Sequence, residues 1–128
     1  MIESRIVAVD HVTLESGVEV EEAMRWFYGE LVVLDEVAAA CEPGRRLVFK
    51  SGRIELRVAF VAEPHVDPID SRVAILVPSL KEVTDVLDDR KIAFEPVSGL
   101  RWSDRCIAVH DPAGHRIELR EHWPFFVL

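Results

Sequence analysis

The pentapeptide Arg-Ile-Glu-Leu-Arg occurs twice in this chain, at residues 53–57 and again at 116–120. In each half it follows a β-branched stretch, a stretch with helical spacing and two further strand-like segments. The apolar positions at helical spacing are Val20, Ala23, Met24 and Phe27 in the first half and Leu80, Val83, Val86 and Leu87 in the second. Because both the pentapeptide and its surroundings recur, the sequence indicates a tandem duplication of one β-α-β-β-β unit.

The duplication divides a single domain, residues 1–128, into two modules. We place module 1 at about residues 4–63 and module 2 at about residues 70–122, followed by an apolar tail at 123–128. Two prolines in residues 63–68 mark the linker between the modules. The expected strands cover about 6–14, 32–39, 46–50 and 53–61 in module 1, and about 72–77, 92–97, 105–110 and 115–121 in module 2.

Side chains alternate between the two faces of a strand, so the repeat also predicts which residues share a face. The face expected to pack on the helices carries Ile54, Leu56, Val58 and Phe60 in module 1, and Ile117 and Leu119 in module 2. The opposite face is expected to carry His11, Glu55, Arg57, Arg72, Glu118 and Arg120. In this alignment His11 of the first strand corresponds to Arg72 of the second module.

Composition limits the partners and the compartment of the protein. A chain of 128 residues that is 49% hydrophobic is long enough for a buried core, and its net charge of −8 disfavours nucleic acid and anionic lipid as partners. No apolar run is long enough to span a bilayer, and the first five residues lack the layout of a secretion signal. Cys41 and Cys106 lie too far apart in sequence for a metal-binding pair. We therefore expect a cytoplasmic protein with two free thiols.

Three segments resemble the glyoxalase, bleomycin-resistance and extradiol-dioxygenase group, the vicinal oxygen chelate superfamily. They are Asp10-His11-Val12, Trp26-Phe27-Tyr28 with Leu31, and the stretch from Asp111 to Leu119. The resemblance covers nearly the whole chain. It implies an α+β fold in which two tandem βαβββ modules form a cup-shaped, mostly antiparallel sheet with helices on the outer face. It also implies metal-ligand positions at His11, Glu55, Arg72 and Glu118, and a homodimer.

Arg72 departs from the pattern of the metalloenzymes in this superfamily. A guanidinium stays protonated and has no lone pair for a metal, so only His11, Glu55 and Glu118 remain as ligands of one divalent ion such as Zn, Mn, Fe or Ni. Alternatively, Arg72 forms ion pairs with the glutamates in place of a metal, or these side chains are merely the polar face of a sheet. The same choice holds for Arg57, Arg72 and Arg120, which either recognise an anionic ligand or balance the neighbouring glutamates.

The remaining candidate residues have plain structural interpretations. Trp102 is either a wall of the ligand site or a loop anchor, and Cys106 is expected to be a small buried side chain. We expect surface positions for the other histidines, which are His65, His110, His115 and His122. The apolar tail needs cover, either from its own domain or from a homodimer interface.

Three functions stay open from the sequence. In the first, the cup binds a small molecule and acts as a metal-dependent lyase, isomerase or dioxygenase, with Glu55 or Glu118 moving a proton. In the second, a metal-free cup sequesters a drug or metabolite, as bleomycin-resistance proteins do. In the third, the chain is a scaffold dimer without ligand chemistry.

Overall fold

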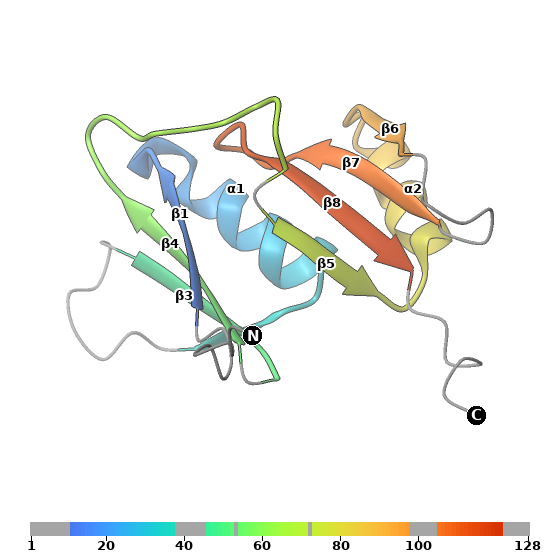
Figure 1. Ribbon diagram of the computed structural model, residues 1–128, viewed down its shortest axis with the longest axis horizontal. Coiled ribbons are helices and arrows are strands. Elements are labelled where there is room, and N and C mark those ends of the chain that lie inside the picture. The colour runs from blue at the N-terminus through green and yellow to red at the C-terminus, as the bar shows by residue number, and fades with distance from the viewer. Residues whose placement is uncertain (1–10, 38–45, 53, 72, 98–104, 122–128) are drawn as a thin grey trace, which may run out of the picture.

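The computed structural model describes residues 11–37, 46–52, 54–71, 73–97 and 105–121. It confirms the α+β architecture of two modules, each with a curved four-stranded sheet and a helix (Figure 1). No helix in these ranges is long and apolar enough to cross a membrane. Trp102, Arg72, His122 and the tail 123–128 lie outside the described residues.

The two modules repeat one topology. Module 1 consists of β1 (His11–Ser16), a 3-10 turn (Val18–Val20), α1 (Glu21–Trp26), a π-helical turn (Phe27–Leu31), β2 (Asp35–Val37), β3 (Arg46–Ser51) and β4 (Ile54–Phe60). Module 2 consists of β5 (Val73–Val77), α2 (Leu80–Asp89), β6 (Phe94–Pro96), β7 (Cys106–His110) and β8 (Arg116–Glu121). The strand orders are β1-β4-β3-β2 and β5-β8-β7-β6, with β1 parallel to β4 and β5 parallel to β8. The other strand pairs are antiparallel.

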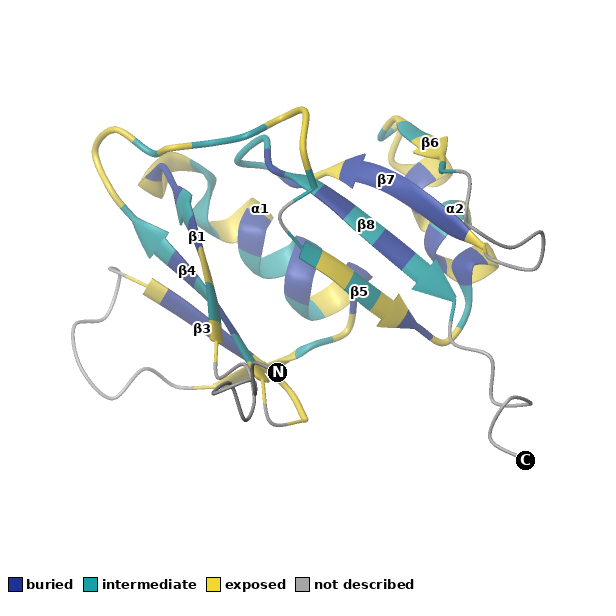
Figure 2. Ribbon diagram, viewed as in Figure 1, coloured by how far each residue is buried: buried dark blue, intermediate teal, exposed yellow. Residues whose placement is uncertain are grey.

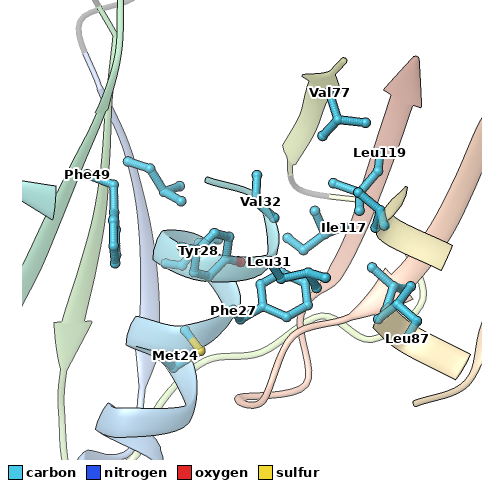
Figure 3. Close-up of a cluster of buried hydrophobic side chains, with 14 of the residues drawn as sticks. Met24, Phe27, Tyr28, Leu31, Val32, Phe49, Val77, Leu87, Ile117 and Leu119 are labelled. Atoms are coloured by element: carbon cyan, nitrogen blue, oxygen red, sulfur yellow. The ribbon is translucent and has the colours of Figure 1, made fainter. Parts of the chain in front are cut away.

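One hydrophobic core joins the modules, with α1 and its π-helical turn between the two sheets (Figure 3). Phe27 and Leu31 point toward Ile117 of β8 and Leu87 of α2, while Tyr28 packs against Phe49 of β3. The strand residues that face this core are buried, and their neighbours in sequence are more exposed, as Figure 2 shows along β8. The sheets therefore share one interior through a single helix.

The segment after α1 differs from the sequence expectation. Residues 32–34 were expected to begin a strand, but the helix continues as a π-helical turn to Leu31 and β2 begins only at Asp35. Val33 ends the helix with a left-handed backbone, φ 62°, which costs a β-branched residue energy. Its side chain is 74% exposed, so packing of that side chain does not offset the strain. This turn sets the backbone position of the next residue, Leu34.

Buried hydrogen bonds fix the modules against each other. The hydroxyl of Tyr28 donates to Oδ2 of Asp111 at 2.6 Å, and Asp111 Oδ1 accepts from the backbone N–H groups of Ala113, Gly114 and His115 at 3.0 Å each. His115 Nε2 lies 2.6 Å from the carbonyl oxygen of Glu15. The expected surface position of His115 is therefore wrong, because this side chain, 2% exposed, reaches module 1 from the β7–β8 turn. His110 and His65 are exposed, as expected.

We expect Tyr28→Phe to lower the free energy of unfolding by about 1–3 kcal/mol, because a buried Asp111 oxygen loses its donor. The ring would keep its packing against Phe27 and Phe49. Urea unfolding followed by circular dichroism would measure the change. Thr84→Val is the control, since it also removes a hydroxyl but at an exposed hydrogen bond. An equal, small effect of both substitutions would show that the Tyr28–Asp111 bond does not stabilise the module junction.

Candidate functional site

The alternation of β4 and β8 determines where the two pentapeptide glutamates lie. Leu56 and Leu119 face the common core, so Glu55 and Glu118 lie on the opposite faces of their strands. These faces belong to two separate sheets. Within one chain the two carboxylates therefore lie in two separate polar clusters. We call the cluster around Glu55 the module 1 half-site and the cluster around Glu118 the module 2 half-site.

The strand register changes the expected equivalence of His11 and Arg72. His11 lies opposite Glu55, and the residue opposite Glu118 is Ala74. The alignment of His11 with Arg72 is therefore wrong by two residues, although Arg72 itself lies outside the described residues. A two-residue shift preserves the face of a strand, which explains why alternation alone did not reveal the error.

In the module 1 half-site, Glu55 is paired along its own strand. Arg57 Nη2 donates to Glu55 Oε2 at 2.9 Å, and both side chains are partly buried. His11 and Lys50 occupy the opposite positions on the flanking strands β1 and β3. Glu55 thus lies among three residues that carry or can acquire positive charge.

In the module 2 half-site, Glu118 is held by three donors. Ser71 Oγ donates to Glu118 Oε2 at 2.9 Å, and Arg116 Nη1 donates to the same oxygen at 3.2 Å and also contacts Ser71 Oγ. Arg120 Nη2 lies 3.5 Å from the other carboxylate oxygen. The Ser71 hydrogen bond, followed by the two guanidinium groups, lowers the pKa of Glu118. This carboxylate is therefore ionised and already partnered at neutral pH.

Cys106 completes the module 2 half-site. Its sulfur lies 3.8 Å from Glu118 Oε1, and the residue is buried, as the sequence predicted. Burial, and then the nearby carboxylate, raise the pKa of the Cys106 thiol. Cys106 is consequently a poor nucleophile.

Sequence reasoning missed Arg116 and Ser71. Arg116 has the same strand parity as Glu118 and Arg120, so the alternation that placed those two residues was sufficient to place it. Ser71 lies just before β5 and has no sequence signal that distinguishes it from an ordinary loop serine. For Arg57 and Arg120, the structure places each guanidinium on a neighbouring glutamate.

The donor groups in the part of the chain that the structure describes do not fit a metal ion within one chain. Within the described ranges no three His, Cys, Asp or Glu residues lie close enough together to hold one. Glu118 also faces two guanidiniums, which would repel a divalent cation.

A cleft of about 430 Å³ lies between the modules. Its lining residues are Val12, Leu34, Ser51, Ile54, Glu55, Leu56, Val73, Ala74, Ile75 and Leu76. Most of this wall is aliphatic, and Glu55 is its one ionisable side chain among these residues. Leu76 is 64% exposed and Ile54 is 45% exposed, so apolar surface is open to solvent here.

Comparison with known proteins identifies the fold through solved structures. No protein-family model and no curated protein matches the sequence. A protein assigned to the glyoxalase family from Bacillus anthracis is 27% identical, with a TM-score of 0.78 over 95% of this chain and 100% of that one. The fosfomycin resistance protein FosX from Listeria monocytogenes is 14% identical, with a TM-score of 0.71 over 96% of this chain and 99% of that one. TnmS3, an antibiotic binding protein from a Streptomyces species, is 21% identical, with a TM-score of 0.69 over 94% of this chain and 100% of that one.

The chain has the vicinal oxygen chelate fold. The resemblance stated from its sequence is thereby confirmed. In this chain Arg116 and Arg120 surround the second glutamate, Glu118.

The depressed pKa of Glu118 predicts a loss of stability in acid. A carboxyl group whose pKa is lower in the folded state stabilises the fold above the ordinary glutamate pKa of about 4.3, and this contribution is lost as the pH falls through the folded value. We expect wild type to exceed Glu118→Gln in unfolding free energy at pH 7, and the difference to shrink below about pH 4.3. Glu30→Gln, an equal charge change at an exposed position, is the control. A difference that does not vary with pH would contradict the role of the Ser71 and arginine contacts.

Proposed function

We propose that the protein binds a small, largely apolar molecule in the cleft between its modules, as a metal-free binding protein. The aliphatic lining of the cleft is the observation that carries this proposal. Its volume lies in the range of about 300–1,000 Å³ that is common for ligand sites. Solvent-exposed Leu76 and Ile54 would leave water when a ligand binds, which favours apolar ligands.

Two further observations support binding rather than metal chemistry. Glu118 is already neutralised by its arginine and serine contacts, so placing a metal there would require breaking them. Among proteins with the same fold, TnmS3 is described as an antibiotic binding protein. Its description supports small-molecule binding as the function of this chain.

The test uses an uncharged apolar dye, Nile red, whose fluorescence rises when it leaves water. We expect saturable binding to the wild-type chain and at least about tenfold weaker binding to Ala74→Phe, because the added ring would occupy the cleft beside β5. Val18→Phe, a similar enlargement at an exposed position outside the cleft lining, is the matched control. Equal dye affinity in the Ala74→Phe and Val18→Phe variants would refute this location for the site.

A metal-dependent enzyme assembled from two copies of the chain is the second candidate. His11 and Glu55 lie opposite each other on neighbouring strands, which favours a pair of ligands on one module. β1 and β5 each pair with only one strand in the described part of the chain, so each leaves an edge against which a second copy can pack. In that dimer the module 1 half-site of one copy would meet a module 2 half-site of the other.

Metal analysis tests this second candidate directly. Protein purified without chelator or affinity tag would be assayed for bound metal, and its melting temperature measured with added Zn, Mn, Fe or Ni ions. A stoichiometric metal that is lost in His11→Ala would support the enzyme. If the protein contains no metal and its melting temperature does not shift with added ions, the enzyme hypothesis is refuted and the metal-free binding protein remains. If the dye does not bind either, the scaffold dimer remains.

A further inference from the structure

We propose that Leu34 is a movable part of the cleft wall, and that the strained backbone of Val33 allows long ligands to displace it. The inference rests on the proposed function for the location of the ligand site. It concerns the selection of ligands by length, which the aliphatic lining alone does not determine. Three observations carry it: the position of Leu34 in the wall, the left-handed turn before it and the extended conformation that the local sequence favours.

Leu34 is held differently from the other residues that line the cleft. Those residues belong to β1, β3, β4 and β5, whereas Leu34 lies between the π-helical turn and β2. Its side chain is half-buried against the core, and its backbone N–H donates to the carbonyl oxygen of Tyr28 at 2.9 Å. This part of the wall therefore depends on the end of a helix for its position, not on a sheet.

The turn that positions Leu34 is strained at Val33. A φ of 62° in a β-branched residue disfavours this conformation by a factor of about ten in a local equilibrium. Val33 is exposed, while Val32 before it packs in the core (Figure 3) and Leu34 after it is half-buried. The contacts of its neighbours thus hold Val33 in the strained state. Residues held in this way, and π-helical turns, occur often at functional sites.

The local sequence favours a second state in which this segment is extended. Residues 32–34, Val-Val-Leu, have strand preference and were expected to begin the strand that starts at Asp35 in the structure. Asp35 pairs with Lys50, so one further residue of β2 would place Leu34 opposite Ser51, the last residue of β3. Leu34 would lose its hydrogen bond to Tyr28 and gain a place at the end of the sheet.

The two states differ in the space that they leave for a ligand. A change of φ at Val33 from 62° to the extended region reorients the chain before Leu34, so the Leu34 side chain would leave its present place in the wall. A short ligand fits beside Leu34, whereas a longer one takes the space of that side chain and shifts the equilibrium to the extended state. Because Val33 is strained, this shift costs a long ligand about tenfold less in affinity than it would with an unstrained turn.

The experiment measures how affinity depends on ligand length. Straight-chain alcohols from 1-hexanol to 1-tetradecanol would be used to displace Nile red from the full-length protein. In wild type each added methylene should tighten binding by about fourfold until the chain reaches Leu34. Val33→Asn should weaken binding of the longest alcohols by about tenfold and leave the short ones unchanged, because asparagine adopts the left-handed backbone with little strain.

Val33→Thr is the matched control. Threonine is also polar but keeps the β-branch and hence the strain, so its length profile should equal that of wild type. Leu34→Ala removes the side chain that long ligands displace. In that background the longest alcohols should bind more tightly than to wild type, and Val33→Asn should no longer alter the profile. Circular dichroism and melting temperature would verify that every variant is folded.

Nuclear magnetic resonance would observe the change of backbone directly. The Cα and Cβ chemical shifts of a residue differ between left-handed and extended backbone. In isotope-labelled wild type, 1-tetradecanol should move these shifts of Val33 toward extended values, and 1-hexanol should leave them in place. A purely structural role of Val33 would not produce this dependence on ligand length.

The outcomes separate this inference from the proposed function. If Nile red binds but the length profiles of wild type and Val33→Asn are the same, the movable wall is overturned and the ligand site remains. An equal loss of affinity for every alcohol in Val33→Asn would also overturn it, since Val33 would then only support the fold. If neither the dye nor any alcohol binds to wild type, the proposed function is refuted, and this inference with it.

Discussion

The packing of α1 and its π-helical turn between two sheets is the constraint on which the rest of the structure depends. Phe27, Tyr28 and Leu31 provide apolar surface on more than one side of a short helix, and each module covers part of it. Neither four-stranded sheet has enough apolar surface of its own for an independent core. The two modules consequently share one hydrophobic core, and the buried Tyr28–Asp111 hydrogen bond joins them.

This shared interior determines the location of the polar residues. Once Leu56 and Leu119 face the core, strand alternation puts Glu55 and Glu118 on the outer faces of two different sheets. A polar site that contains both carboxylates therefore cannot form on a single sheet. The cleft between the modules is a separate consequence of the same packing. It is mainly aliphatic because β5 borders it on one side and apolar residues of module 1 on the other, namely Val12, Leu34, Ile54 and Leu56.

The repeated pentapeptide was sufficient to predict the fold, since its copies recur with their strands and helices, and Leu56, Ile117 and Leu119 face the core. The expected core position of Ile54 is wrong, because this residue at the start of β4 is 45% exposed and lines the cleft. The pentapeptide did not predict the ion pairs, because those depend on register and on loop residues. An alignment of the first strands by similarity made Arg72 the counterpart of His11 in module 2. In the structure the counterpart is Ala74, which pairs with Glu118 as His11 pairs with Glu55. The burial of His115 was equally unpredictable, since its partner is a backbone carbonyl 100 residues earlier in the chain.

The two modules have diverged in the residues beside the repeated glutamate. In module 1 Glu55 has His11 and Lys50 opposite it on the flanking strands, whereas in module 2 Glu118 has Ala74 and Ala108. A carboxylate between two alanines has no charged residue directly opposite it on the flanking strands, so its positive partners come from its own strand.

Arg116 and Arg120 are these partners, two positions before and two positions after Glu118. The same replacement of polar residues makes the outer face of β5 apolar, since Ala74 and Leu76 hold the positions that His11 and Thr13 hold in β1. The arginine-paired glutamate and the β5 side of the aliphatic cleft wall thus have a common origin in the sequence of one strand. This relation explains why a duplicated chain has one module with a polar strand edge and another with an edge suited to apolar molecules.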